Sequence, residues 1–383
     1  MKNSDNGNDQ PVSTKNDIDV SNTYAKDLDC PQEYAKQLQH ILPRSLLPLG
    51  NDDLIRNLPP SLRAINLMCY FGGDGTGTPL HQDISGAIGH NIMLFGEESA
   101  YAQWLVTSKD DTNHLRQACR SAWKGREKCS FVESEQTCIS LDVLAKRNVK
   151  THVILQQPGD LVIIPSLCFH QVTNIGLSFK VAWNRITPHS LLNSFKIQLP
   201  LYRFIGRPEL YRCKATIYFA LKQIAVDIPK LSSTMQQQQS FLEKCRILLH
   251  LFANDVILPE LIEPFPFDDD AEDAILQDKQ LKARDIGFNR TCDFCCGDIF
   301  HRYYSCTDCQ LDLCLSCYVS GRSCAHPNAF RMHEPYSHGI DNTDPFHLRN
   351  GSMMQYIQLY YDILDKLHMA FGSCSIIPEY SSL

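Results

Sequence analysis

The spacing of the cysteines in the last third of this chain constrains its fold more than any other feature. Eight of the 17 cysteines lie between Cys292 and Cys324. They include three pairs with two intervening residues, which begin at Cys292, Cys306 and Cys314. Thiolates at this spacing are typical zinc ligands, and so short a segment cannot bury enough apolar surface to fold without a metal. The sequence therefore predicts a small domain organised by zinc.

Length and charge exclude several classes of protein. The chain has 383 residues and a formal net charge of −7. This length predicts two or three domains, and the acidic balance argues against binding to the nucleic-acid backbone as the main activity. We expect no direct sequence-specific nucleic-acid binding. No apolar run approaches the roughly 18 residues of a membrane span, and the first residues lack the apolar core of a secretory signal, so we expect neither a membrane partner nor disulfides.

The pattern of apolar residues divides the chain into segments. Strand-like text runs from about 66 to 187, with clear strands at 89–95 and 160–165, and helical text follows from 188 to about 262. Short amphipathic helices are predicted at 31–40 and 353–371, while the four glutamines at 236–239 are expected in a loop or at a frayed helix end. The predicted divisions are a disordered N-terminus (1–25), a β domain (26–190), a helical extension (191–265), an acidic linker (266–287), a zinc domain (288–340) and a C-terminal helix (345–372).

Three residues of the β segment have the chemistry of an iron site. His81 and Asp83 are two apart, so in a strand both side chains point to one face. His170 follows the strand 160–165, 87 positions after Asp83. Two imidazoles and one carboxylate leave three open positions on non-haem Fe(II), which suits a bidentate 2-oxo acid and O₂. Zinc favours a four-coordinate site instead.

The order of these motifs resembles the JmjC family over about residues 54–189. The matching pieces are Tyr70-Phe71-Gly72, His81, Asp83, Asn91, Gly159-Asp160 and His170-Gln171-Val172. The pieces Gly89-His90-Asn91-Ile92-Met93 and Lys180-Val181-Ala182 look most like the branch that demethylates lysine 9 of histone H3. The resemblance implies a mainly β, double-stranded β-helix (cupin) fold and a nuclear Fe(II)- and 2-oxoglutarate-dependent dioxygenase. It also implies demethylation of methyl-lysine on a histone tail or another protein, by N-methyl hydroxylation with release of formaldehyde.

The co-substrate site departs from the family in one respect. Many JmjC proteins carry a lysine after a Phe-Gly-Glu stretch to bind the far carboxylate of 2-oxoglutarate, but the residues after Phe95 include none. Lys180 is the expected substitute, because a lysine within an apolar strand is costly unless a carboxylate pairs with it. A lysine that reaches solvent from an edge strand is the alternative, and Lys109 is the next candidate. Thr78 and Asn91 are expected to face the co-substrate.

Two further residues are expected to bind the substrate. Tyr70 matches the family position whose ring lines the methylammonium pocket, and an aromatic face attracts a methylated cation. Asn184 is expected to line the same pocket. Read without the resemblance, Tyr70 is equally compatible with a core tyrosine.

The cysteine segment resembles a ZZ-type zinc finger. In that family the ligand pairs cross-brace, which implies one zinc on Cys292, Cys295, Cys314 and Cys317 and a second zinc on Cys306, Cys309, His326 and His333. Cys324 and His338 compete for the last two positions, and Cys296 is expected to be a bystander. ZZ fingers bind protein tails, so a protein-tail ligand is an expected partner.

Two other functions remain compatible with the sequence. A protein side-chain hydroxylase has the same fold, and site residues alone do not decide the substrate. A catalytically weak scaffold that uses its zinc finger as a reader is the other alternative, favoured by the missing lysine after Phe95. The oligomeric state is not predicted.

Overall fold

The structure is a computed structural model that describes residues 23–122, 133, 135, 138–230, 234–261, 290–333 and 353–372. The predicted acidic linker 266–287 and His338 lie outside the described residues, as does most of the segment predicted to be disordered. The prediction that disorder extends to residue 25 is wrong, because the first strand begins at Tyr24.

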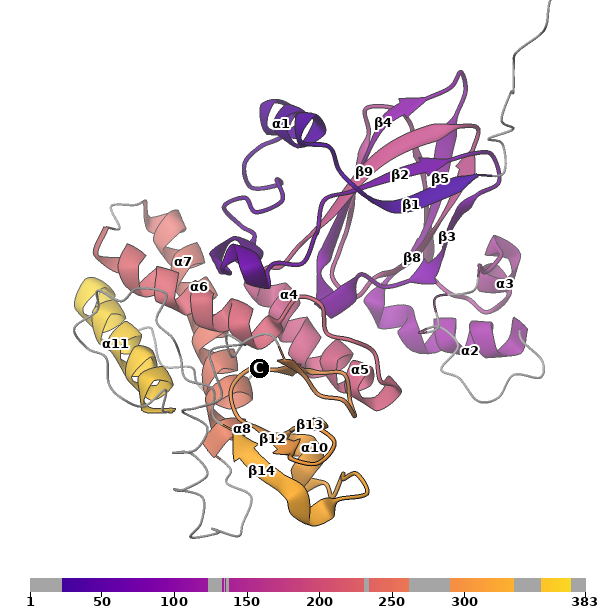
Figure 1. Cartoon of the computed structure of the whole chain (residues 1–383). Coiled ribbons are helices and arrows are strands. Elements are labelled where there is room, and N and C mark those ends of the chain that lie inside the picture. The colour runs from indigo at the N-terminus through magenta and orange to yellow at the C-terminus, as the bar shows by residue number, and fades with distance from the viewer. Residues whose placement is uncertain are drawn as a thin grey trace, which may run out of the picture.

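Two antiparallel sheets form the N-terminal half (Figure 1). The first sheet has the order β1-β2-β9-β4-β7. Its strands are β1 (Tyr24–Asp29), β2 (Met68–Gly72), β9 (Ser178–Arg185), β4 (Ile88–Gly96) and β7 (Leu161–Ile164). The second sheet has the order β3-β8-β5-β6, made of β3 (Gly77–His81), β8 (Phe169–Ile175), β5 (Tyr101–Thr107) and β6 (Thr151–Gln156).

The two sheets pack face to face through alternating side chains. Met93 and Val162 from the first sheet are buried in one cluster with Trp104 and Val172 from the second. This is the cupin-like β fold that the strand pattern and the family resemblance predict.

Helices cover the outer faces of both sheets. Helix α1 (Gln32–Ile41) packs Leu38 against Val181 and Trp183 on the first sheet. Helices α2 (Thr112–Ala122) and α3 (Leu141–Lys146) pack Leu115 and Leu144 against Phe169 of the second sheet. The 3₁₀ helices of this half are η1 (Leu54–Asn57), η2 (Pro60–Leu62), η3 (Ile84–Gly86) and η4 (Lys109–Asp111).

The helical region follows β9, as the sequence predicts. Its elements are α4 (Pro188–Asn193), the π-helix η6 (Ser194–Gln198), α5 (Leu199–Ile205), α6 (Cys213–Asp227), η7 (Ile228–Lys230), α7 (Met235–Leu251), the π-helix η8 (Phe252–Ile257) and α8 (Leu258–Leu261). The C-terminal amphipathic helix is confirmed as α11 (Met353–Phe371), and its Ile363 and Leu367 are buried in one core with Leu221 and Ile224 of α6.

The four glutamines are not in a loop. Residues 236–239 lie in the first turn of α7. The Thr234 hydroxyl accepts from the Gln237 backbone N–H, and Gln237 Oε1 accepts from the Thr234 backbone N–H. This reciprocal capping satisfies two backbone N–H groups, which explains why a polar tract begins a helix here.

The cysteine segment forms a small module on the helical region, as Figure 1 shows. It consists of β10 (Arg290–Thr291), β11 (Asp298–Ile299), β12 (Tyr303–Cys306), β13 (Asp312–Cys314), α10 (Leu315–Val319), η10 (Pro327–Ala329) and β14 (Phe330–His333). Asp298 pairs with Arg212 at 2.5 Å, and Arg302 lies 3.6 Å from Glu260 of α8. Among the described residues, no helix is both long enough and apolar enough to cross a membrane.

Candidate metal centres and co-substrate pocket

The three predicted iron ligands meet between the two sheets. His81 is the last residue of β3 and lies directly opposite His170 of β8, with ring centroids 4.1 Å apart. Asp83 follows at the start of η3, and its Oδ2 lies 3.9 Å from His170 Nε2. One ligand atom from each of the three residues falls within 4.8 Å of the others. The pairing of β3 with β8 thus joins two histidines that are 89 positions apart.

Backbone carbonyls fix the tautomer of both imidazoles. His81 Nδ1 lies 2.7 Å from the Pro79 carbonyl oxygen, and His170 Nδ1 lies 3.1 Å from the Cys168 carbonyl oxygen. Because a carbonyl only accepts, each Nδ1 carries the hydrogen and each neutral ring leaves its Nε2 lone pair available. This is the usual arrangement of metal-binding histidines.

The electrostatics of the triad suit a cation. Burial raises the pKa of Asp83 to about 6 and lowers the pKa of His81 and of His170 to about 4. Asp83 Oδ2 is buried and has no hydrogen-bond partner among the described residues. A buried, unpartnered carboxylate oxygen beside two neutral imidazoles fits Fe(II), whose charge would offset the cost of desolvating the carboxylate.

Space beside Asp83 depends on a glycine. A Cβ atom on Gly89 of β4 would lie 2.3 Å from Asp83 Oδ2. Any larger residue there would push the carboxylate out of its position. Gly89 therefore belongs to the site although it contributes no side chain.

The helical region holds the backbone of the same turn. Gln198, at the end of the π-helix η6, donates from Nε2 to the Asp83 carbonyl oxygen at 3.0 Å and accepts from the Gly86 N–H. The Gln198 side chain is buried, so these two hydrogen bonds fix the backbone at Asp83 just after the end of β3. A π-helix at a functional site is a common arrangement.

Lys180 faces the interior between the sheets. It lies on β9 opposite Tyr70 and Met93, is only 5% exposed, and donates from Nζ to the side-chain oxygen of Asn174. Desolvation lowers the pKa of Lys180 to about 8, and within the described part of the chain no carboxylate offsets this effect. The edge-strand alternative is wrong, since this lysine does not reach solvent, whereas Lys109 is exposed at the start of η4.

Thr78 and Asn91 are both directed inward by their strands. Thr78 Oγ1 lies 2.7 Å from the hydroxyl of Tyr24, which lies in the segment 1–25 that the sequence predicts to be disordered. Asn91 Oδ1 accepts from Gln156 Nε2 at 3.2 Å. Thr78 thus has a tyrosine neighbour in the pocket, whereas Asn91 is held by a buried glutamine.

The two predicted substrate residues have polar partners. The Tyr70 hydroxyl donates to Asp27 Oδ1 at 2.7 Å, and Asp27 occupies a bulge in β1 with a left-handed φ of 55°. The Asn184 amide donates to the Tyr211 hydroxyl at 3.2 Å, and it also faces Asp83, where it lowers the pKa of that carboxyl against the larger effect of burial. Tyr70 therefore lies beside an acidic group, and Asn184 borders the iron ligands.

The cysteines form two groups with the geometry of zinc sites. Cys292, Cys295, Cys314 and Cys317 form the first group, and Cys306, Cys309, Cys324 and His326 form the second. The sulfurs of Cys295 and Cys314 are 3.8 Å apart and those of Cys306 and Cys324 are 3.5 Å apart. A tetrahedral zinc with Zn–S bonds of about 2.3 Å separates its sulfurs by about 3.8 Å, so both groups fit this metal.

The prediction of His333 as a zinc ligand is wrong for this geometry. Strand β14 pairs with β12 so that Phe330 lies opposite Cys306 and His333 lies opposite Tyr303, three residues further along. The His333 ring stacks on Tyr303 with centroids 5.1 Å apart. Cys324 takes the fourth position instead, while Cys296 belongs to neither group.

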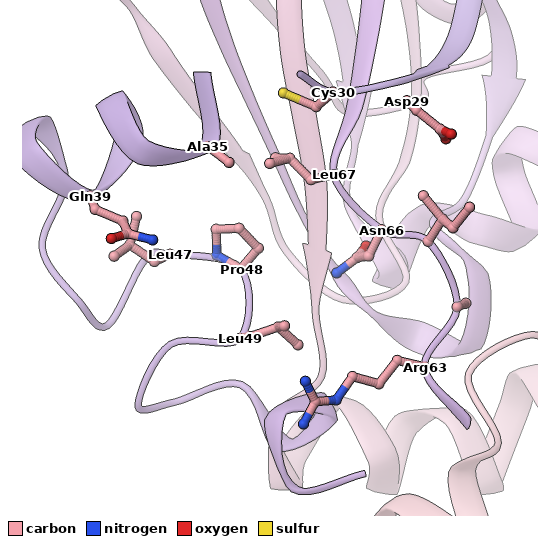
Figure 2. A pocket seen from close by; sticks show the side chains of 12 residues that line it. Asp29, Cys30, Ala35, Gln39, Leu47, Pro48, Leu49, Arg63, Asn66 and Leu67 are labelled. Atoms are coloured by element: carbon pink, nitrogen blue, oxygen red, sulfur yellow. The ribbon is translucent and has the colours of Figure 1, made fainter. Parts of the chain in front are cut away.

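A separate cavity of about 510 Å³ lies beside the first sheet (Figure 2). It is lined by α1, by residues 47–49 and by residues 63–67, and it includes none of the three triad residues. Asn66 lines it and donates to the Asn184 carbonyl oxygen. This cavity therefore lies behind the Asn184 segment and is distinct from the iron site.

Comparison with known proteins finds a domain of an oxygenase family over the residues that form the iron site. Residues 68–185 match the family model described as "JmjC domain, hydroxylase", so the chain carries a JmjC domain there. The chain is also similar to C-module-binding factor A of Dictyostelium discoideum, at 31% identity over 312 residues. The match covers 79% of this chain and 31% of the relative, so the chain spans about a third of the length of that protein. The domain match supports an oxygenase-type activity of the 2-oxoglutarate class.

Proposed function

We propose that this protein is an Fe(II)- and 2-oxoglutarate-dependent dioxygenase that demethylates methyl-lysine on a histone tail or another protein in the nucleus. The observation that carries the oxygenase part is the triad itself. His81 and His170 offer their Nε2 atoms, and Asp83 offers a buried, unpartnered oxygen. Lys180 supplies a buried cation for the far carboxylate of the co-substrate.

Different residues of the chain are proposed to hold the metal, orient the co-substrate and exclude water. Iron bound to the triad, together with 2-oxoglutarate and O₂, supplies the oxidising chemistry that hydroxylates a C–H bond. Lys180, aided by Thr78 and Tyr24, orients the co-substrate by binding its far carboxylate. The apolar packing around Trp104 and Val172 excludes water from the interior.

The substrate assignment rests on Tyr70 and Asp27. An aromatic ring and an acidic group at the pocket border favour a cationic side chain over a neutral one. The Tyr70 ring provides the face for a methylated ammonium group, and the Asp27 carboxylate, which is exposed, supplies negative charge.

Both cysteine groups are proposed to bind structural zinc. Their burial differs, because the first group is largely buried whereas Cys309 and His326 of the second are exposed. A ZZ-type finger on this scaffold would present its exposed face to a protein tail.

Hydroxylation of a protein side chain is the second candidate. The matching family model is itself described as a hydroxylase. Both reactions begin by hydroxylating a C–H bond, and they differ in whether the product loses formaldehyde or remains as an alcohol.

One experiment separates the candidates. Protein purified without oxygen and loaded with Fe(II) is incubated with 2-oxoglutarate, O₂ and methylated histone peptides, and both succinate and peptide masses are measured. Loss of methyl groups with formaldehyde, absent from the His81→Ala variant, supports the demethylase. A gain of one oxygen per peptide without formaldehyde assigns the protein to the hydroxylases. Normal iron binding without succinate formation would overturn both enzymatic proposals.

A further inference from the structure

The loop between α5 and α6 touches both the cysteine module and the residues beside the iron site. On the module side, the Glu209 N–H donates to the Cys296 carbonyl oxygen at 3.3 Å, and Glu209 Oε2 accepts from the Asp298 N–H at 3.3 Å. Arg212 pairs with the buried carboxylate of Asp298 at 2.5 Å. Cys296 follows Cys295 of the first cysteine group, so these contacts begin one residue from a metal ligand.

On the other side, the same loop presents Tyr211 to the interior. Its ring is only 5% exposed. Its hydroxyl donates to Asn66 Oδ1 at 3.0 Å and accepts from Asn184 Nδ2 at 3.2 Å. Asn66 Oδ1 also accepts from the Asn184 backbone N–H at 2.9 Å, so Tyr211 and Asn66 together hold Asn184 in one orientation. Asn184 in turn lies directly opposite Gly89 in the pairing of β9 with β4, and Gly89 lies against the Asp83 carboxylate, so Asn184 faces Asp83.

The backbone of the loop leaves little freedom between its two ends. Arg212 has a left-handed φ of 43°, Glu209 Oε1 accepts from the Cys213 N–H at 2.9 Å, and Thr216 Oγ1 donates to the Tyr211 carbonyl oxygen at 3.1 Å. Because Glu209 binds the module with one oxygen and the start of α6 with the other, a shift of the module would move the residues next to Tyr211.

We propose that Tyr211 is a positioning residue for the iron ligand Asp83, and that the cysteine module is a structural part of the iron site because it sets the loop 206–212. Tyr211 acts through Asn184 and touches no reacting atom. Loss of metal from the first cysteine group loosens the hold on Glu209 and Arg212, and the effect reaches Asp83 as weaker binding of iron. The module therefore serves the oxygenase domain in addition to any tail that it binds.

The inference requires that the triad binds iron but not that the substrate is a methylated lysine. It is tested with the full chain, zinc-loaded and freed of iron, by titrating Fe(II) anaerobically and measuring the dissociation constant. The variants are Tyr211→Phe, which keeps the ring and removes the hydroxyl, and Asp298→Asn, which weakens the docking of the loop. Glu260→Gln is the matched control, because it breaks the other buried ion pair of the module without touching this loop.

We expect iron to bind about tenfold more weakly to Tyr211→Phe and to Asp298→Asn, since residues behind metal ligands commonly change affinity by about 10–100-fold. Glu260→Gln should bind iron as the wild type does, and zinc content should stay unchanged in all three variants. A double variant of Tyr211 and Asp298 should lose less than the sum of the two single effects in free energy, because both act on one path.

The absorption of the Fe(II)–2-oxoglutarate chelate provides a second measurement that a purely structural role would not move. The wavelength of its absorption maximum depends on how the protein ligands surround the iron, and this wavelength should shift in Tyr211→Phe at saturating iron. Wild-type iron affinity and wild-type absorption in both Tyr211→Phe and Asp298→Asn would overturn the inference. If His81→Ala also bound iron as the wild type does, the triad would not be the iron site, and the proposed function would be contradicted instead.

Discussion

The buried ammonium group of Lys180 donates to the side-chain oxygen of Asn174 between the two sheets. An amide oxygen is a weak partner for a buried cation, because it offers only partial charge. Lys180 therefore keeps a strong preference for an anion, which a dicarboxylic co-substrate would satisfy.

Removing this charge should weaken the binding of 2-oxoglutarate. Charge-assisted hydrogen bonds contribute about 1.5–3 kcal/mol, so Lys180→Met is expected to raise the dissociation constant about 10–100-fold. Lys109→Met is the matched control and should leave it unchanged, because Lys109 is exposed. Calorimetric titration of 2-oxoglutarate into the metal-loaded protein measures both. Equal losses in the two variants would assign the anchor elsewhere.

The affinity for 2-oxoglutarate should also depend on pH. Desolvation lowers the pKa of Lys180 to about 8, so the group is charged below this pH and neutral above it in the free protein. The dissociation constant should be flat below pH 8 and rise as the pH passes above it. Lys180→Arg should lose this dependence over the same range, because a guanidinium stays charged. A dependence that persists in Lys180→Arg would point to another group.

Asp27 should act on the substrate and not on the co-substrate. Asp27→Asn removes the negative charge beside Tyr70, and we expect KM for a methylated peptide to rise about fivefold or less, because Asp27 is exposed and exposed ion pairs contribute only about 0.2–1 kcal/mol. Formation of succinate without peptide should not change. Steady-state kinetics with and without peptide provide the test, and a change confined to the peptide-free reaction would contradict it.

The second cysteine group gives a choice between two residues. Cys324→Ser should remove one of two bound zinc ions per chain, whereas His333→Ala should retain both. Zinc content by atomic emission, with protein determined by amino-acid analysis, decides between them. Loss of zinc from His333→Ala alone would restore the assignment made from the sequence.

The iron triad was predictable because its chemistry is local in sequence. The sequence predicts His81 and Asp83 on one face of a strand, and their side chains do converge, although β3 ends at His81 and Asp83 caps η3. The distant His170 follows a recognisable buried strand. The burial of Lys180 was predictable for a similar reason, since a charge within an apolar strand is conspicuous, whereas its role as the co-substrate anchor stays a prediction. The boundaries of α11 follow from apolar spacing alone.

The residues that support the site could not be found in this way. Tyr24 meets Thr78 across 54 positions, and Gln198 meets Asp83 across 115. Such contacts depend on which strands pair and where a helix docks, and neither appears in local periodicity. His333 was misassigned because spacing does not reveal strand register, and β14 places it three residues from Cys306 along the ladder.

The hydrogen at Cα of Gly89 has a consequence for related chains. A single methyl group there would lie 2.3 Å from the carboxylate oxygen of Asp83, so any larger residue requires that carboxylate to move from its present position. Related chains are therefore best compared at this residue as well as at the three ligands. A relative that keeps both histidines and the aspartate but carries alanine at this position would need a different placement of its carboxylate to bind iron.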